Sequence, residues 1–225
     1  MSEQTGGLSG ETVQRQAIIE TARAMSASGL SPGRSGNVSS RWRNGMLITP
    51  SGMNYDAIGV DDVVFVGQQG EFATDARKPS SEWRFHLAIY AERGDVGAVV
   101  HTHSTNATAL ACAHKAIPAF HYMVAVAGGK DIPLVPYATF GTEKLSLNVA
   151  SGLRERNACL MANHGQTAVG ATLGAALELA QEVETLATQY VEVLKLGAVN
   201  VLDDDEMAKV VDRFQNYGQV AQTTN

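Results

Sequence analysis

Cysteine is scarce in this chain of 225 residues, which contains only Cys112 and Cys159. Each lies alone within an apolar segment rich in alanine and leucine. We therefore expect both to be small core residues of a protein from a reducing compartment, and we expect neither a disulfide nor a zinc pair.

An excess of positive charge is also missing, because 17 lysines and arginines are set against 23 aspartates and glutamates. A formal net charge of −6 gives no support for nucleic-acid binding through phosphate neutralisation. No apolar run approaches the ~20 residues that a membrane-spanning helix needs, so no membrane partner is expected. The first seven residues, Met1–Gly7, contain neither a basic leader nor an apolar core. We therefore expect a cytoplasmic protein.

The composition that is present, 44% apolar and 18% charged residues, is typical of a globular protein. The chain contains no long linker, internal repeat or low-complexity block, and its length suffices for one well-buried domain. We expect a single domain over 1–225, with 1–10 flexible and 216–225 forming a mobile C-terminal tail.

Helical and extended patterns alternate along the chain. Apolar spacing predicts helices over 11–28, 81–93, 105–114, 143–154, 173–196 and 204–217. Short strands or extended segments are predicted at 37–42, 46–49, 63–66, 71–72, 97–100, 133–137, 158–161 and 166–169. Turn sequences at 44–45 and 68–70 indicate hairpins. Because hairpins join the strands as often as helices do, we expect a mixed or mainly antiparallel sheet covered by helices.

Three histidines carry the clearest chemical signal. His101 and His103 lie at the end of the apolar run 97–100. Residues two apart on a strand point to the same side, ~7 Å from each other, so both imidazoles can converge on one ion. His164, beside a glycine, can supply a third ligand and leave a position open for a carboxylate, water or substrate. Each histidine alone can equally be a hydrogen-bonded core or surface residue, and that alternative stays open here.

Small polar residues and glycines recur at strand ends and turns. They occupy 35–37, 49–52 and 80–81, the last directly before Glu82 and a predicted helix. Amides freed by glycine, hydroxyl groups and a helix N-terminus are the usual means of holding a phosphate dianion. Each segment alone is typical of a turn, and 80–81 can equally be a helix cap. Three in one chain favour an anion site beside the metal, built from neutral donors because few basic residues accompany them.

Taken together, these motifs resemble the class II aldolase/adducin family. The matching segments are Gly36–Ser39, Leu47–Gly52, Lys78–His86, Val99–Ser104 and Asn163–Gly165. The segments 121–129 and 132–142 resemble the L-fuculose-1-phosphate aldolase branch, and the match runs from about residue 12 to 218. The resemblance implies an α/β fold, a single domain with a central, largely antiparallel β-sheet flanked by helices on both sides. It also implies zinc and a homotetramer with active sites between subunits.

The reaction implied by this resemblance is reversible cleavage of a ketose 1-phosphate into dihydroxyacetone phosphate and an aldehyde, the work of a zinc-dependent aldehyde-lyase. L-fuculose 1-phosphate, 5-deoxyribulose 1-phosphate and 5-methylthioribulose 1-phosphate all remain candidate substrates. Mn²⁺ or Co²⁺ can replace Zn²⁺, because all three accept imidazole ligands in similar geometry. A sugar-phosphate 4-epimerase, a methylthioribulose-1-phosphate dehydratase and an adducin-like scaffold without activity are the alternatives on the same fold.

Residue roles follow from the same resemblance. His101, His103 and His164 match the family's zinc ligands, and Glu82 matches a carboxylate that ligates zinc without substrate and otherwise serves as acid/base. Tyr122 matches a tyrosine that reaches into the neighbouring subunit's site and handles the proton on the aldehyde oxygen. The residues that match the phosphate cradle are Gly36, Asn37, Ser51, Gly52, Ser80 and Ser81. The residues that match the aldehyde pocket are Phe140 and, on the C-terminal tail, Tyr217, with core packing as the alternative for these aromatics.

Overall fold

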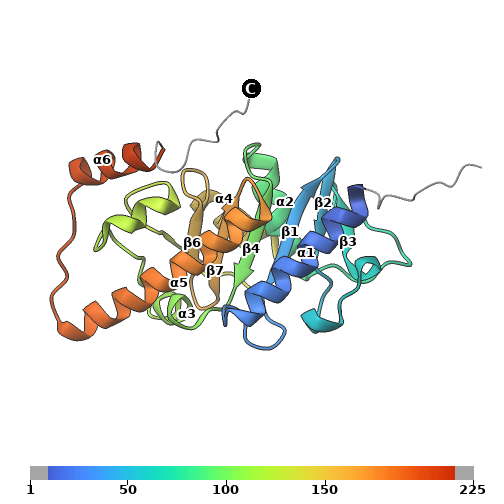
Figure 1. The fold of residues 1–225 in the computed structure, drawn as a ribbon, viewed down its shortest axis with the longest axis horizontal. Coiled ribbons are helices and arrows are strands. Elements are labelled where there is room, and N and C mark those ends of the chain that lie inside the picture. Colours follow the sequence, from blue (N-terminus) through green and yellow to red (C-terminus); the bar gives the residue numbers. More distant parts are fainter. Residues whose placement is uncertain (1–9, 216–225) are drawn as a thin grey trace, which may run out of the picture.

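Seven β-strands form one sheet in residues 10–215, the part of the chain that the computed structural model describes (Figure 1). They are β1 (Asn37–Trp42), β2 (Gly45–Ile48), β3 (Val64–Gly67), β4 (Ala98–Thr102), β5 (Leu134–Val135), β6 (Ala158–Met161) and β7 (Gly165–Gly170). The strand order is β3-β2-β1-β4-β7-β6-β5. Every neighbouring pair is antiparallel except β5 and β6, which are parallel. The expected largely antiparallel sheet is confirmed.

Helices cover both faces of this sheet (Figure 1). One layer contains α1 (Gly10–Ala27), α3 (Thr105–Cys112) and α5 (Leu173–Leu196), and the other contains α2 (Trp83–Glu92) and α4 (Glu143–Gly152). The last described helix, α6 (Asp204–Gln215), packs against the short 3₁₀ helix η3 (Tyr122–Ala127). None of the helices within 10–215 is long and apolar enough to cross a membrane.

Two hydrophobic clusters, one on each side of the sheet, hold the layers together. Alternate residues of β4 point to opposite layers, with Val99 packed against α2 and α4 while Ala98 and Val100 belong to the α1 and α5 side. Fully buried aliphatic side chains such as these contribute about 1.5–3 kcal/mol each relative to exposure. The end of β4 that contains His101 is therefore anchored by apolar packing on both faces.

Two sequence-based expectations are wrong in detail. Cys112 is exposed, because the buried face of α3 is formed by Ala107, Leu110 and Ala111, and position 112 falls on the opposite side. Cys159 is buried as expected, and burial raises the pKa of its thiol to about 12. Both cysteines are free.

The second error concerns 71–72, which forms no strand. The chain does turn after β3, and Gly67 N–H donates to Glu71 O at 2.9 Å. The Glu71 carboxylate then accepts from the Gln69 amide at 2.9 Å, which closes a compact turn instead of starting a ladder. The segments expected to be flexible or mobile were 1–10 and 216–225. Gly10 is the first residue of α1, whereas 1–9 and 216–225 lie outside the described residues, as does the end of the helix predicted over 204–217.

Candidate metal centre and anion pocket

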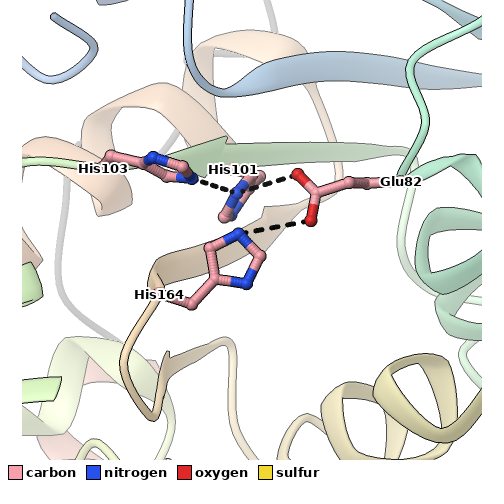
Figure 2. Close-up of side chains that lie close together, drawn as sticks. All are labelled: Glu82, His101, His103 and His164. Atoms are coloured by element: carbon pink, nitrogen blue, oxygen red, sulfur yellow. Dashed lines mark hydrogen bonds and ion pairs between the residues drawn. The ribbon is translucent and has the colours of Figure 1, made fainter. Parts of the chain in front are cut away.

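The four residues with ligand-like side chains come from three separate parts of the fold. Glu82 is the residue directly before α2, yet its side chain makes no cap hydrogen bond to that helix. His101 lies in β4 and His103 follows the last residue of that strand, while His164 lies in the turn between β6 and β7. Figure 2 shows all four side chains pointing toward one centre. The histidine pair thus converges as the strand geometry predicted.

Distances between the ligand atoms define the centre. His101 Nε2 lies 3.0 Å from His103 Nε2 and 3.1 Å from Glu82 Oε2. Glu82 Oε1 lies 3.2 Å from His164 Nε2 but makes no hydrogen bond with it. The four ligand atoms all lie within 4.8 Å of one another. Four acceptor-rich groups therefore surround one small volume.

A backbone contact fixes the orientation of the innermost imidazole. His101 is fully buried, and its Nδ1 lies 2.8 Å from the carbonyl oxygen of Gln166 in β7. Because a carbonyl can only accept, Nδ1 carries the proton and donates it. In the neutral ring, Nε2 then presents its lone pair to the centre. Such an outer hydrogen bond is the usual way in which proteins orient a metal-binding histidine.

The imidazoles of His103 and His164 are neutral at ordinary pH. Burial, together with the neighbouring His101 and His164, lowers the pKa of His103 to about 3. Burial and His101 likewise lower the pKa of His164 to about 4. Burial alone raises the pKa of Glu82, but contacts with His101, His164 and Asn37 outweigh it and hold that pKa below its usual range. The centre therefore presents unprotonated nitrogens and an ionised carboxylate.

These properties fit a divalent metal. Glu82 Oε1 is buried without a hydrogen-bond partner within 10–215, which is costly for a carboxylate oxygen unless a cation satisfies it. Three imidazole nitrogens and one carboxylate oxygen form a donor set that zinc accepts. Among the described residues, these four make up the group that can hold a metal ion.

A cleft of about 330 Å³ opens beside the metal centre and is lined by Glu82, His103 and His164. All six residues predicted to form the phosphate cradle line the same cleft: Gly36, Asn37, Ser51, Gly52, Ser80 and Ser81. Three sequence segments that looked like separate turns are thus one surface.

Only glycine fits at position 36 of this cleft. Its φ of 85° lies in the left-handed region, and a Cβ there would approach Ser31 Oγ to 2.5 Å and the His101 carbonyl oxygen to 2.6 Å. The absence of a side chain therefore lets the loop that contains Gly36 lie directly against β4, the strand that contains His101.

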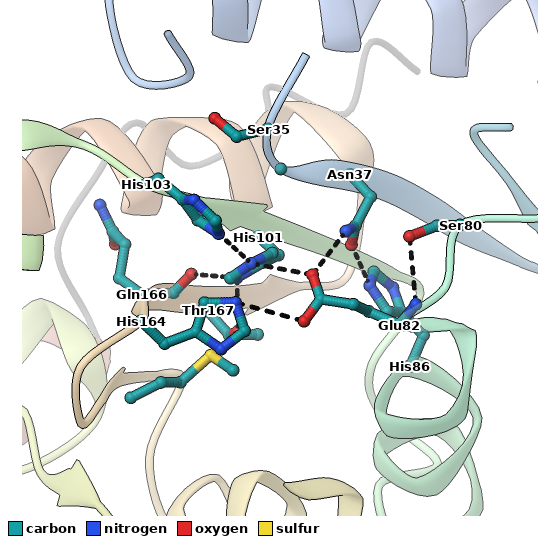
Figure 3. Close-up of polar contacts among 12 residues, drawn as sticks. Ser35, Asn37, Ser80, Glu82, His86, His101, His103, His164, Gln166 and Thr167 are labelled. Atoms are coloured by element: carbon teal, nitrogen blue, oxygen red, sulfur yellow. Dashed lines mark hydrogen bonds and ion pairs between the residues drawn. The ribbon is translucent and has the colours of Figure 1, made fainter. Parts of the chain in front are cut away.

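A chain of buried hydrogen bonds extends from the Glu82 carboxylate through Asn37 to His86 (Figure 3). Asn37 Nδ2 donates to Glu82 Oε2 at 3.1 Å, so Asn37 Oδ1 accepts from His86 Nε2 at 2.5 Å. His86 Nδ1 must then accept from Ser39 Oγ at 2.6 Å, and that hydroxyl lies 2.8 Å from the Tyr90 hydroxyl. Burial lowers the pKa of His86 to about 3, which keeps the ring neutral as this direction of donation requires.

The predicted aromatic residues lie in different places. Phe140 lines the cleft with 65% of its surface exposed. Tyr122 does not line that cleft; it is half exposed and lies with Met123, Val210 and Phe214 along a groove between η3 and α6. Its ring stacks on His121, with centroids 4.9 Å apart. Tyr217 lies outside the described residues.

Several residues of the site were missed by the sequence analysis. The buried chain adds His86, Ser39 and Tyr90, and the cleft also includes Arg34, Met53 and Tyr137. Spacing offered one usable signal, since His86 lies one helical turn after Glu82. No local pattern indicated Arg34, whose neighbours form an ordinary glycine- and serine-rich loop.

Comparisons with known proteins agree with this geometry. Residues 16–191 match the family model described as "Class II Aldolase and Adducin N-terminal domain". The chain is 50% identical over 208 residues to a 5-methylthioribulose-1-phosphate/5-deoxyribulose-1-phosphate aldolase of Rhodospirillum rubrum, covering 92% of this chain and 94% of that protein. It is 46% identical over 202 residues to an L-fuculose phosphate aldolase of Escherichia coli (strain K12), covering 89% and 94%. A solved structure of L-fuculose 1-phosphate aldolase superimposes with a TM-score of 0.87 at 38% identity, covering 90% and 96%.

Proposed function

The chain belongs to the class II aldolase and adducin family, and from this premise we propose that it cleaves a ketose 1-phosphate reversibly into dihydroxyacetone phosphate and an aldehyde. The observation that carries the proposal is the convergence of Glu82, His101, His103 and His164 at one end of a cleft lined by phosphate-binding groups. The same reaction is supported by the two aldolases to which the chain is similar over about nine-tenths of its length.

His101, His103 and His164 are the residues that hold the metal, with Glu82 as a fourth ligand in the absence of substrate. When bound, Zn²⁺ supplies the positive charge that stabilises the negative oxygen of an enediolate. Zinc is the expected ion because of the three imidazoles, and Mn²⁺ or Co²⁺ can satisfy the same donors.

The phosphate of the substrate is held by the cradle. Backbone amides around Gly36 and Gly52 and the hydroxyl groups of Ser51, Ser80 and Ser81 supply donors. Asn37 belongs to both parts of the site, because its amide already donates to Glu82 while its backbone lies in the cradle. This shared residue sets the carboxylate next to the carbon atoms nearest the phosphate.

Glu82 is the acid/base of the reaction in this proposal. Its carboxylate is 6% exposed and therefore works in a site from which most water is excluded. A carboxylate acts best as a base when its pKa lies near the working pH, so Glu82 would need to be free of the cation in order to take up a proton. The amide of Asn37, fixed by His86, is the group that keeps hold of the carboxylate during this change.

Tyr122 completes the site from a neighbouring copy of the chain. It does not line the cleft of its own chain, and it is a half-exposed residue of η3. The resemblance assigns this position a proton transfer at the aldehyde oxygen, across an interface. We therefore propose a homotetramer in which no single chain contains a complete active site.

The aldehyde end of the substrate is apolar in this proposal. The lining residues that do not belong to the cradle include Met53, Tyr137, Ala138 and Phe140. Hydroxyl-free tails, as in 5-deoxyribulose 1-phosphate and 5-methylthioribulose 1-phosphate, leave no polar group unmatched against such walls. These two are the proposed substrates, with L-fuculose 1-phosphate third. Tyr217 is proposed to contribute to substrate binding at the same end. We also propose a cytoplasmic location, because the proposed substrates are phosphorylated sugars.

One experiment tests the reaction and its rivals together. Purified protein is loaded with zinc and offered each of the three ketose 1-phosphates, and the products are separated. Dihydroxyacetone phosphate plus an aldehyde supports the aldolase. A single isomer indicates an epimerase and a single dehydrated ketone indicates a dehydratase, and either would replace the proposal. Protein that retains no metal and converts none of the three ketose 1-phosphates would support the alternative of a scaffold without activity.

A further inference from the structure

We infer that Arg34 is the residue that balances the charge of the substrate phosphate and thereby sets the affinity for phosphorylated substrates. This inference rests on the proposed function, since it names the group that recognises the phosphate in that cleft. It differs from the expectation of a cradle made of neutral donors alone.

The charge of the cleft is the first argument. Among the described residues that line it, Arg34 is the one lysine or arginine and Glu82 is the one aspartate or glutamate. Without Arg34 the lining would present a net negative charge to a dianion, and like charges repel. With Arg34 the protein part of the cleft is balanced before a metal or substrate enters.

The position of the guanidinium is the second argument. Arg34 Nη1 donates to the carbonyl oxygen of Gly52 at 2.9 Å, although 18 residues separate the two. Gly52 is itself a member of the cradle, and Arg34 lies two residues before Gly36. The hydrogen bond therefore joins two of the three segments of the cradle and holds the guanidinium at their junction.

The chemistry of arginine is the third argument. A guanidinium has five N–H groups in a planar fork, and the bond to Gly52 occupies one nitrogen. The remaining donors can make the paired, charge-assisted bonds that arginine forms with phosphate.

Two substitutions test the inference, Arg34→Gln and Arg34→Lys, with Arg77→Gln as the matched control. Arg77 is also exposed and also hydrogen-bonded, to Asp62 at 2.8 Å, but it does not line the cleft. The control therefore removes the same unit of charge from the chain without touching the cradle. Thermal unfolding of each variant shows that it is folded.

For Arg34→Gln we expect KM for the ketose 1-phosphate to rise about ten- to hundredfold, the range for losing a hydrogen bond to a charged group. The turnover number should change less than about threefold, because the charge acts on binding and not on bond cleavage. Arg34→Lys should lie between, since lysine keeps the charge but loses the fork. Wild-type KM should rise with ionic strength, and this dependence should weaken in Arg34→Gln.

Inorganic phosphate supplies a readout that does not depend on catalysis. Its binding to the zinc-loaded protein, measured by calorimetry, should weaken in Arg34→Gln by a factor similar to the change in KM, and should be unaffected in Arg77→Gln. Unchanged phosphate affinity in folded Arg34→Gln would overturn the inference and leave the residue as a tie between two loops. A wild-type protein that releases no dihydroxyacetone phosphate would instead refute the aldolase proposal, while the phosphate titration would still decide the role of Arg34.

Discussion

The metal centre and the aromatic rim of the site are built in opposite ways. Glu82 and His101 are almost fully buried and are held by hydrogen bonds that reach into the sheet and α2. Tyr122, Tyr137 and Phe140 have between 50% and 65% of their surface exposed and lie on loops or on η3. In the proposed function, the metal centre belongs to the buried region, whereas selection among aldehydes belongs to exposed side chains such as Phe140, which can change without disturbing the core.

The largest effect is expected from removing a metal ligand, because this should abolish the buried metal centre. We expect His103→Ala to lose bound zinc and to reduce kcat/KM by about 10⁴-fold or more, because the charge that stabilises the transition state departs with the metal. Metal analysis after dialysis and an assay for dihydroxyacetone phosphate measure the two losses. His114→Ala, which removes an exposed histidine outside the ligand set, should keep its metal. Full metal content in His103→Ala would contradict the assigned ligand set.

Tyr122 sharpens the comparison, because it belongs to the exposed region and is nevertheless proposed to take part in chemistry. Tyr122→Phe should lower kcat by about 10²–10³-fold, in the range for loss of a general acid–base group. Zinc content should be unchanged. Mixed oligomers made from Tyr122→Phe and His103→Ala chains should recover part of the activity, since some sites then combine an intact metal centre with an intact tyrosine. No recovery on mixing would indicate that Tyr122 acts within its own chain or not at all.

The buried histidines make the metal-free protein sensitive to acid. His86 has a pKa of about 3 in the folded protein, compared with about 6.5 when unfolded. Between these values the unfolded chain binds more protons, so stability falls as the pH falls. From pH 6.5 to pH 5 the loss for this one group is about 2 kcal/mol, and it is absent above pH 7. Urea unfolding of the metal-free protein across this range measures the sum of this loss and the similar losses from His103 and His164, whose pKa values are also lowered, to about 3 and about 4. A flat profile would show that none of these histidines stays neutral in the fold.

The smallest effect is expected at the rim. Phe140→Ala should change the ratio of kcat/KM between 5-methylthioribulose and 5-deoxyribulose 1-phosphates by less than about tenfold, because apolar contacts discriminate weakly. In the synthesis direction, KM for dihydroxyacetone phosphate should stay within about twofold, since the phosphate end is not touched. Competition between the two substrates in one reaction measures the ratio directly. A large change in the KM for dihydroxyacetone phosphate would mean that Phe140 also acts on the phosphate end of the site.

The same contrast explains which features could be predicted from the sequence. His101 and His103 were recognisable because strand periodicity places alternate residues on one face, and that rule is local. Gly36 and Gly52 were recognisable as turn residues because turn signals are local as well. The six residues predicted to form the phosphate cradle, together with Phe140, lie in one cleft, although their segments are far apart in the chain.

Contacts between distant residues could not be predicted in this way. The hydrogen bond of His86 with Asn37 spans 49 positions, and no single window of sequence contains both residues. Arg34 was overlooked because its role depends on a carbonyl oxygen in another loop. Cys112 was misjudged because its neighbours are apolar, whereas burial in a helix depends on the face and not on the neighbourhood.

The bond from His101 to the Gln166 carbonyl ties the metal centre to the alignment of two strands. In the ladder of β4 and β7, His101 is opposite Thr167 and Thr102 is opposite Gln166. A slip of one position would move the accepting carbonyl and turn the imidazole away from the centre. In the proposed metal centre, metal occupancy is therefore a reporter of strand alignment, and a substitution far out on either strand that shifts this ladder would be detected first as metal loss in a chain that is still folded.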